Sequence, residues 1–222
     1  MGIGLTGAAD GATLVGMQVP GYKRIVPWLL ARGNRPYERW MAERKRRLLG
    51  GLSGEVVEIG PGAGANLPYL RSDVHWIGVE PNPYARPYLE RAAREAGVSC
   101  EVRQGSAERL PLQTASADAV VGTLVLCSVK DVDAALREIL RVLKPGGRFV
   151  FIEHVAAPAG TLRRRLQRWA RPVWRVIADG CHPDRETLES IRAAGFARVE
   201  AEQFLVPAGL VAPHVAGIAV KA

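Results

Sequence analysis

The sequence is poor in cysteine and has no long hydrophobic run. Its three cysteines, Cys100, Cys127 and Cys181, are odd in number, widely spaced and without a C-x-x-C pair. This pattern argues against a disulfide framework and against a zinc site, so no metal is expected and a reducing, cytoplasmic compartment is favoured. No stretch approaches the roughly 20 apolar residues that a transmembrane helix needs. The start of the chain also lacks the features of a typical signal peptide.

Acidic residues are scarce in two segments of this chain, whose formal net charge is +8. Residues 23–47 contain nine lysines and arginines against two glutamates, and residues 161–175 contain six arginines and no acid. Such segments suit an anionic membrane, a nucleic acid or an acidic substrate, but they also occur as solvated helix faces. Nucleic acid is not the expected partner, because the chain has no RNA-binding module and no aromatic-rich basic groove.

Strand-like and helical patterns alternate through most of the chain. Strands are expected near residues 55–60, 74–80, 99–103, 118–126, 147–155, 197–206 and 214–221. Helices are expected near 36–49, 65–71, 83–96, 131–143 and 184–194. The alternation predicts an α/β fold, a Rossmann-like doubly wound sheet of about seven strands, mostly parallel with an antiparallel last strand, and helices on both faces. Residues 1–33 are expected to be a partly disordered N-terminal arm, and 34–222 a single domain.

The most informative motif is the glycine turn Glu58-Ile-Gly-Pro-Gly-Ala-Gly-Ala-Asn66, which follows the first expected strand. Glu80 ends the second strand, twenty positions after Gly60. Glycines allow the backbone to turn tightly and approach a ligand, and the acid can accept hydrogen bonds from both ribose hydroxyls. This arrangement is typical of a half-domain that binds an adenosine-containing cofactor.

The turn by itself does not identify the cofactor. Gly60, Gly62 and Ala65 also satisfy the dinucleotide pattern G-x-G-x-x-G/A, so an NAD or FAD enzyme is an alternative. Two further segments narrow the choice, Gly105-Ser-Ala-Glu-Arg-Leu-Pro111 after the third strand and Leu143-Lys-Pro-Gly-Gly147 before the fifth. With the glycine turn and Glu80, they resemble the motif series of class I S-adenosylmethionine-dependent methyltransferases over about residues 54–222.

The resemblance implies S-adenosylmethionine as the cofactor and assigns residues to it. The glycines would surround its methionine and ribose parts, Glu80 would hold the ribose hydroxyls, and the segments after the second and third strands would enclose the adenine. The residues implied in cofactor binding are Glu58, Gly60, Pro61, Gly62, Gly64, Asn66, Glu80, Pro81, Asn82, Ser106, Ala107, Glu108, Thr123 and Leu124.

Four downstream segments, 122–130, 153–157, 179–181 and 213–217, look like those of the thiol S-methyltransferases of animal endoplasmic reticulum and lipid droplets. This likeness implies that the methyl group goes to a small-molecule thiol. Bacterial-type methyltransferases share the pattern, so O-, N- or C-methylation of a natural product or a lipid amine is the alternative. The Gly/Ala-rich start departs from the apolar anchor of the animal relatives.

A thiol acceptor must lose its proton, and its free pKa of about 8.5 allows a basic or cationic neighbour to assist. His154, at the tip of the fifth strand, is the first candidate for this catalytic role, and His182, which Asp179 could orient, is the second. Either histidine could instead be purely structural. The residues expected to line the acceptor pocket are Cys127, Trp174 and Cys181.

An insert at about residues 160–180 is expected to form an amphipathic helix. Its arginines surround an apolar stripe of Leu162, Leu166, Trp169, Val173 and Ile177, and Pro172 is expected to kink it. Such a helix is typical of a lid or of a peripheral membrane contact, the alternative being a helix that packs on the core. The sequence does not indicate an oligomeric state.

Overall fold

The structure, a computed structural model, describes residues 21–32 and 35–222. These residues contain a single sheet of seven strands in the order β3-β2-β1-β4-β5-β7-β6. The first five strands pair in parallel, and β7 is antiparallel to both of its neighbours. The strands are β1 (Glu55–Ile59), β2 (His75–Glu80), β3 (Ser99–Gln104), β4 (Ala117–Thr123), β5 (Leu143–His154), β6 (Arg198–Leu205) and β7 (Pro213–Val220). The predicted fold is confirmed.

Within the described residues, six α-helices and four short 3-10 helices accompany the sheet. The α-helices are α1 (Val26–Arg32), α2 (Arg35–Leu49), α3 (Arg86–Ala96), α4 (Val132–Val142), α5 (Leu162–Ile177) and α6 (Thr187–Ala193). The 3-10 helices are η1 (Gly21–Arg24), η2 (Leu67–Tyr69), η3 (Pro83–Ala85) and η4 (Gly209–Val211). Residues 1–20 and 33 of the predicted arm lie outside the described residues, and the rest of that arm contains η1 and α1.

The predicted helix at 65–71 is wrong. Gly64 has a φ of +85°, which an α-helix does not allow, and Leu70 is already extended. Only one turn fits between them, and it is the 3-10 helix η2. The glycine turn is therefore not followed by a regular α-helix. A ligand beside it would contact the backbone N–H groups of turns and not those of a helix N-terminus.

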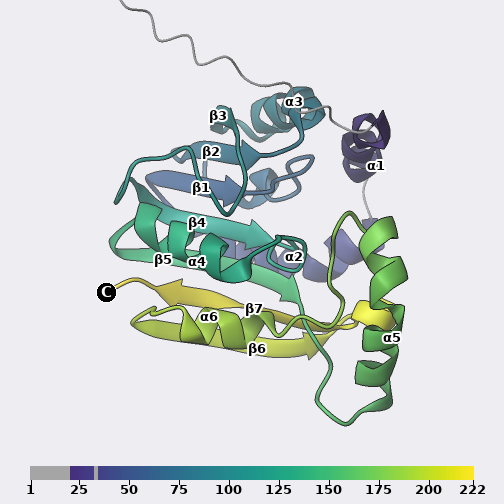
Figure 1. Ribbon diagram of the computed structural model, residues 1–222. Helices are drawn as coiled ribbons and strands as arrows, with labels where there is room; N and C mark the ends of the chain where they lie inside the picture. Colours follow the sequence, from purple (N-terminus) through teal and green to yellow (C-terminus); the bar gives the residue numbers. More distant parts are fainter. Residues whose placement is uncertain (1–20, 33–34) are drawn as a thin grey trace, which may run out of the picture.

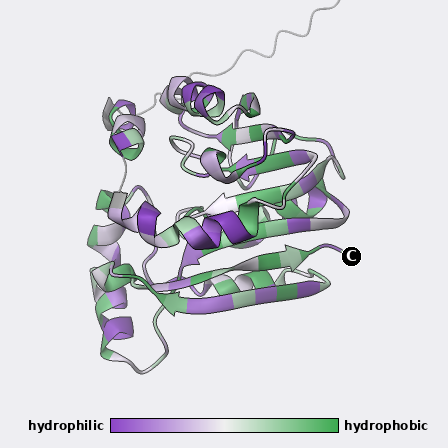
Figure 2. Ribbon diagram, turned by 180° about the vertical axis from the view of Figure 1, so that it is seen from behind, coloured by the Kyte–Doolittle hydropathy of each residue, from purple (hydrophilic) through white to green (hydrophobic). Residues whose placement is uncertain are grey.

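Alternate side chains of β1, β2 and β4 enter two separate cores. Val57, Ile77 and Val120 face α4 and α6, whereas Val56, Trp76 and Val121 face α2 and α3. This alternation follows from the two-residue period of a strand, and burial on both faces is typical of parallel sheets. Figure 2 shows the resulting hydrophobic strands in green. The strands are thus fixed by packing on both faces of the sheet, and residues at the strand ends can form a site.

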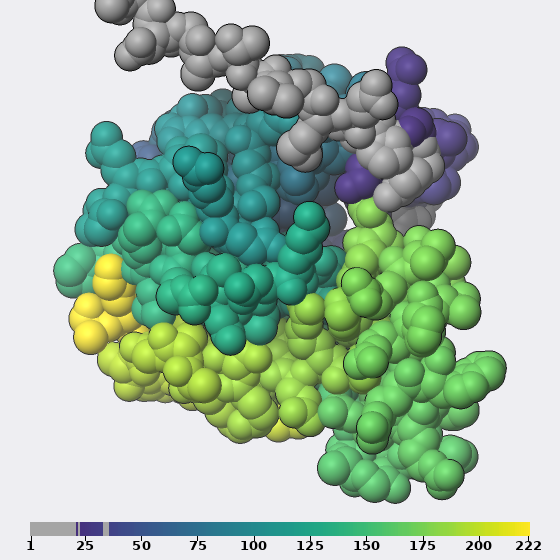
Figure 3. Space-filling model, in the orientation of Figure 1, coloured from purple at the N-terminus to yellow at the C-terminus, as the bar shows by residue number. Residues whose placement is uncertain are grey.

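The predicted insert helix is α5, which continues through Pro172. The side chains of its apolar stripe are exposed. The alternative prediction, that this stripe packs on the core, is therefore wrong. Trp169 is 83% exposed and Val176 82% exposed. Figures 1 and 3 show α5 at the side of the molecule toward which β1, β2 and β4 point. None of the described helices is long and apolar enough to cross a bilayer.

Candidate functional site

The glycine turn lies where β1 ends, at the carboxyl edge of the sheet. Gly60, Gly62 and Gly64 all have positive φ, a conformation that side chains with a Cβ rarely adopt. A Cβ on Gly60 would lie 2.8 Å from Cγ2 of Val125, and one on Gly64 would lie 2.8 Å from Cδ1 of Leu67. The turn therefore packs closely between η2 and the loop after β4. A side chain at Gly60 or at Gly64 would be strained and would meet one of these neighbours.

Glu80, the last residue of β2, links the turn to the neighbouring strand end. Its carboxylate accepts hydrogen bonds from the N–H groups of Gly62 (3.0 Å) and Asn82 (2.9 Å). Burial raises the pKa of Glu80, and these two hydrogen bonds oppose the rise. A carboxylate has about four lone-pair sites, so Glu80 can still accept hydrogen bonds from two ribose hydroxyls.

A second buried carboxylate, Glu58, fixes the start of the turn. It accepts hydrogen bonds from Asn66 Nδ2 and Trp76 Nε1, each at 2.9 Å, and Asn66 Nδ2 also reaches Thr123 Oγ1 at 2.9 Å. Burial raises the pKa of Glu58 to about 7. Asn66 Oδ1 is buried and has no hydrogen-bond partner among the described residues. An orphaned acceptor of this kind suits a ligand that brings an amino group.

The segment after β3 lies against the same strand end. The N–H of Gly105 is 3.4 Å from the carbonyl of Glu80, Ala107 is buried, and Glu108 accepts a hydrogen bond from the N–H of Lys130 (2.8 Å). Ser106 bridges to Arg109 across this short turn. The structure thus brings the residues predicted for the adenine and the ribose together at one edge, and the set fits an adenosine-containing cofactor.

The sequence did not predict that η1 and α1 cover this edge. Asn82 Nδ2 donates a hydrogen bond to the carbonyl of Lys23 (2.8 Å), and Lys23 Nζ lies 3.6 Å from Asp179 Oδ1. Leu30 of α1 lies so close to Gly62 that a Cβ there would be 3.1 Å from Leu30 Cδ1. The first described segment therefore joins the cofactor turn to the loop between α5 and α6.

Glu153, the penultimate residue of β5, organises the loop after β4. Its fully buried carboxylate accepts hydrogen bonds from the N–H groups of Val125 and Leu126, both at 2.9 Å, and of Cys127 at 3.3 Å. Burial raises the pKa of Glu153. Leu124, the first residue of this loop, has a φ of +56°. The sequence offered only the segment 153–157 as a family likeness, and it gave no signal for this role of Glu153.

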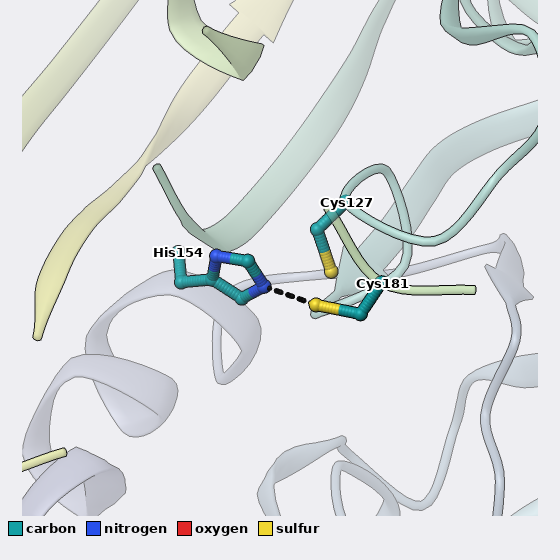
Figure 4. A group of neighbouring side chains, drawn as sticks. All are labelled: Cys127, His154 and Cys181. Carbon is teal, nitrogen blue, oxygen red and sulfur yellow. Dashed lines mark hydrogen bonds between the residues drawn. The ribbon is translucent and has the colours of Figure 1, made fainter. Parts of the chain in front are cut away.

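Two of the three cysteines meet a histidine at this edge. Cys127 follows β4, His154 ends β5 and Cys181 lies between α5 and α6, and Figure 4 shows the three side chains pointing toward one another. The ligating atoms of all three lie within 4.8 Å of one another, and His154 Nε2 is 2.9 Å from Cys181 Sγ. All three residues are buried. The predicted pocket residue Trp174 donates its indole N–H to Cys181 Sγ at 3.3 Å.

This environment is unusual for a cysteine. The neighbouring Cys127 thiol, followed by the His154 ring and the Trp174 N–H, lowers the pKa of Cys181, and burial opposes this effect. The contact with Cys181, together with burial, raises the pKa of Cys127 well above its ordinary value. Cys181 is therefore the sulfur that carries negative charge most readily.

The second catalytic candidate, His182, lies next to the cluster, and its backbone N–H donates to the carbonyl of Cys127 (2.8 Å). Burial and the nearby guanidinium groups of Arg185 and Arg175 lower the pKa of its ring, which makes it a weaker base than an ordinary imidazole. Asp179 is half exposed and lies beside Lys23. On the far side of His154, the ring of His214 has its centroid 6.2 Å from that of His154, and burial lowers the pKa of His214 to about 4.

Comparisons with known proteins agree with this geometry. The family model described as "Methyltransferase domain" matches residues 57–151. The human thiol S-methyltransferase TMT1A is 36% identical over 90% of this chain and 87% of its own, and the rat thiol S-methyltransferase TMT1B is 37% identical over 94% and 91%. A solved structure from Thermotoga maritima, described as a SAM-dependent methyltransferase and possible histamine N-methyltransferase, has a TM-score of 0.58. It is 24% identical and covers 89% of this chain and 100% of its own.

The hydrogen bonds of Glu153 lead to a first prediction. We expect Glu153→Gln to lower the free energy of unfolding by about 2–4 kcal/mol, because the amide nitrogen would face a backbone N–H in a buried position. Urea unfolding followed by circular dichroism measures the loss. The matched control is Glu200→Gln on β6, where the side chain is 68% exposed. Equal stabilities of the two variants would contradict this role of Glu153.

Proposed function

Because the chain belongs to the class I S-adenosylmethionine-dependent methyltransferases, in the family of the thiol S-methyltransferases, we propose that it methylates a small-molecule thiol on sulfur. That it is a methyltransferase with S-adenosylmethionine as its cofactor follows from the family. The observation that carries the choice of acceptor is the buried group of Cys127, His154 and Cys181 beside the cofactor turn. The alternative acceptors are an oxygen, nitrogen or carbon atom of a natural product or a lipid amine.

Bound S-adenosylmethionine supplies an electrophilic methyl group on a sulfonium, and its transfer to a thiol RSH gives RSCH3, S-adenosylhomocysteine and a proton. We propose that the glycine turn and Asn66 hold the amino-acid part of the cofactor. Glu80 would hold the ribose, and Pro81, Asn82 and residues 106–108 would flank the adenine. We propose that η1 and α1, which lie over this edge, limit the access of water to it and so favour the displacement at carbon.

The acceptor side of the site is the loop after β4 and the tip of β5. Val125 packs on Gly60 of the turn, and Cys127 follows it by two residues, so the sulfur and imidazole group adjoins the cofactor turn. We propose that a thiol acceptor approaches there and loses its proton beside His154 and Cys181. His182 and Asp179 remain the second catalytic pair, with Asp179 tied to the N-terminal cover through Lys23.

The role of Glu80 gives the second prediction. We expect Glu80→Gln to weaken S-adenosylmethionine binding by about 10–100-fold, because its amide nitrogen cannot accept the hydrogen bonds of Gly62, Asn82 and the ribose. Isothermal titration calorimetry measures the affinity, and S-adenosylhomocysteine serves as a second ligand. Glu90→Gln, an exposed site on α3, is the matched control. Unchanged affinity in Glu80→Gln would remove the ribose assignment.

The acceptor proposal is tested by a substrate panel. We expect alkyl and aryl thiols to exceed the matched alcohols, catechols, indoles and amines by at least about 10-fold in kcat/KM, because only the thiol ionises readily near neutral pH. The assay is release of S-adenosylhomocysteine by the full chain, with Glu80→Gln as the control for cofactor-dependent turnover. Methylation of an amine, indole or catechol without methylation of thiols would overturn the proposal in favour of the alternative.

The outward face of α5 supports a further proposal, a peripheral contact with an anionic membrane surface. Trp169, Val173 and Val176 are largely exposed there. Arg164 and Arg171 pair with Glu186 and Asp184. Other arginines of α5 have no acidic side chain within ion-pair distance among the described residues: Arg163, Arg165, Arg168 and Arg175. Apolar residues flanked by free arginines are typical of a helix that lies in a membrane interface.

Vesicle sedimentation tests this contact. We expect the chain to bind vesicles that contain phosphatidylserine at least about 10-fold more tightly than vesicles of phosphatidylcholine alone, and less tightly as salt rises. A double variant, Trp169→Glu with Val176→Glu, should abolish most of the binding, whereas Arg91→Glu on α3 should not. Binding that ignores lipid charge, or that survives the double variant, would contradict a contact through α5.

A further inference from the structure

We propose that Cys127, His154 and Cys181 form a zinc site whose fourth position receives the thiol acceptor. This inference rests on the proposed thiol methylation for the identity of the fourth ligand, but the metal site itself does not. Widely spaced cysteines argued against zinc in the sequence; the fold brings two of them together with a histidine from a third segment.

The distances suit a single ion. Zinc binds cysteine sulfur at about 2.3 Å and histidine nitrogen at about 2.0–2.1 Å in tetrahedral geometry, so two ligand atoms on one ion are about 3.6–3.8 Å apart. The ligand atoms of this group lie within 4.8 Å of one another. Its one short contact, 2.9 Å between His154 Nε2 and Cys181 Sγ, must open by about 0.7 Å, a shift that side-chain rotation can supply.

Hydrogen bonds from surrounding residues hold the two cysteine ligands in place. The carboxylate of Glu153 accepts the N–H of Cys127, and the N–H of His182 donates to the carbonyl of Cys127, which ties the two cysteine loops together. The indole N–H of Trp174 points at Cys181 Sγ. Hydrogen bonds that orient ligands from outside are a regular part of metal sites.

The chemistry of the donors selects the ion. Two sulfurs and one imidazole are ligands that zinc prefers, whereas magnesium and calcium prefer oxygen. Two buried thiolates would be costly without a cation, and a doubly charged ion balances both. Three protein ligands with an open fourth position are the pattern of a catalytic zinc site, because a structural zinc site is closed by four. The described residues place three such ligands in this group.

The open position explains a preference for thiols. A thiol RSH that binds there forms a sulfur–zinc bond and releases its proton to solvent, so the bound acceptor is a thiolate at neutral pH. An alcohol would bind more weakly than a thiol to a zinc ion that already has two sulfur ligands, since such an ion prefers soft donors. The neutral thioether product is a poorer ligand than the thiolate and leaves.

Metal analysis of the full chain tests the site. We expect protein purified with a non-thiol reductant and zinc to retain one zinc ion per chain after gel filtration, and cobalt to replace it with the thiolate charge-transfer band of a tetrahedral site. Cys181→Ser and Cys127→Ser should each weaken zinc binding by at least about 100-fold, measured against a chromophoric chelator. Cys100→Ser, the remaining cysteine, is the matched control and should bind zinc as the original chain does.

A measurement without variants covers the case in which a substitution disturbs folding. Zinc should slow the alkylation of Cys127 and Cys181 by iodoacetamide, read by mass spectrometry, and leave Cys100 unaffected. Absence of bound zinc, equal alkylation with and without zinc, or a disulfide between Cys127 and Cys181 under these conditions would overturn the site.

The two proposals fail in different ways. Thiol methylation that persists at full rate after zinc is removed by a chelator would overturn the metal site and leave thiol methylation standing. Zinc bound by all three residues in a chain that methylates only amines or catechols would leave the metal site standing and overturn the thiol as its fourth ligand.

Discussion

The candidate site depends on one set of hydrogen bonds, which the Glu153 carboxylate accepts from the loop after β4. A strand end leaves the following N–H groups without partners, and here three consecutive N–H groups converge on one buried acid from the neighbouring strand. The acid is fixed in turn because β5 is central in the sheet, paired with β4 on one side and β7 on the other. The loop therefore has the rigidity of the sheet although it has no regular structure.

That loop connects the two halves of the site. Its Val125 fills the space that Gly60 leaves by having no Cβ, so the loop touches the cofactor turn. Its Cys127 faces His154, the residue directly after Glu153 in β5. Successive residues of a strand point to opposite sides, so one strand tip can support the loop with one side chain and face the acceptor with the next. In the proposed site, the position of the acceptor relative to the cofactor would thus be set by neighbouring strand ends.

The fold could be predicted from the sequence because each element carries a local signal. Buried parallel strands are apolar runs, helices such as α4 have an apolar face, and the glycine turn has a characteristic spacing. The helix expected at 65–71 failed because the positive φ of Gly64 and the extended Leu70 leave room for one turn only, and neither is visible in hydrophobic periodicity.

The candidate site was predictable in one half only. The residues expected to bind the cofactor stand close together in ordered motifs, so the sequence could name them as a group. The meeting of Cys127 with Cys181, and the cover that Lys23 and Leu30 place over the turn, depend on how distant segments pack, for which the sequence holds no local pattern. Candidate acceptor residues could be named one by one, but their mutual contact could not be predicted.

The buried acidic residues of the chain are concentrated at the candidate site, where they favour a positively charged ligand. Among the described residues, three acidic residues are buried: Glu58, Glu80 and Glu153. All three lie at or next to the carboxyl end of a strand, β1, β2 and β5 respectively. Burial raises the pKa of each, to about 7 for Glu58, so burial disfavours the charged carboxylates and their N–H donors offset this effect only in part. A positively charged ligand at this edge reduces that effect. Because S-adenosylmethionine carries a positively charged sulfonium, these buried acids favour that cofactor at this edge of the sheet.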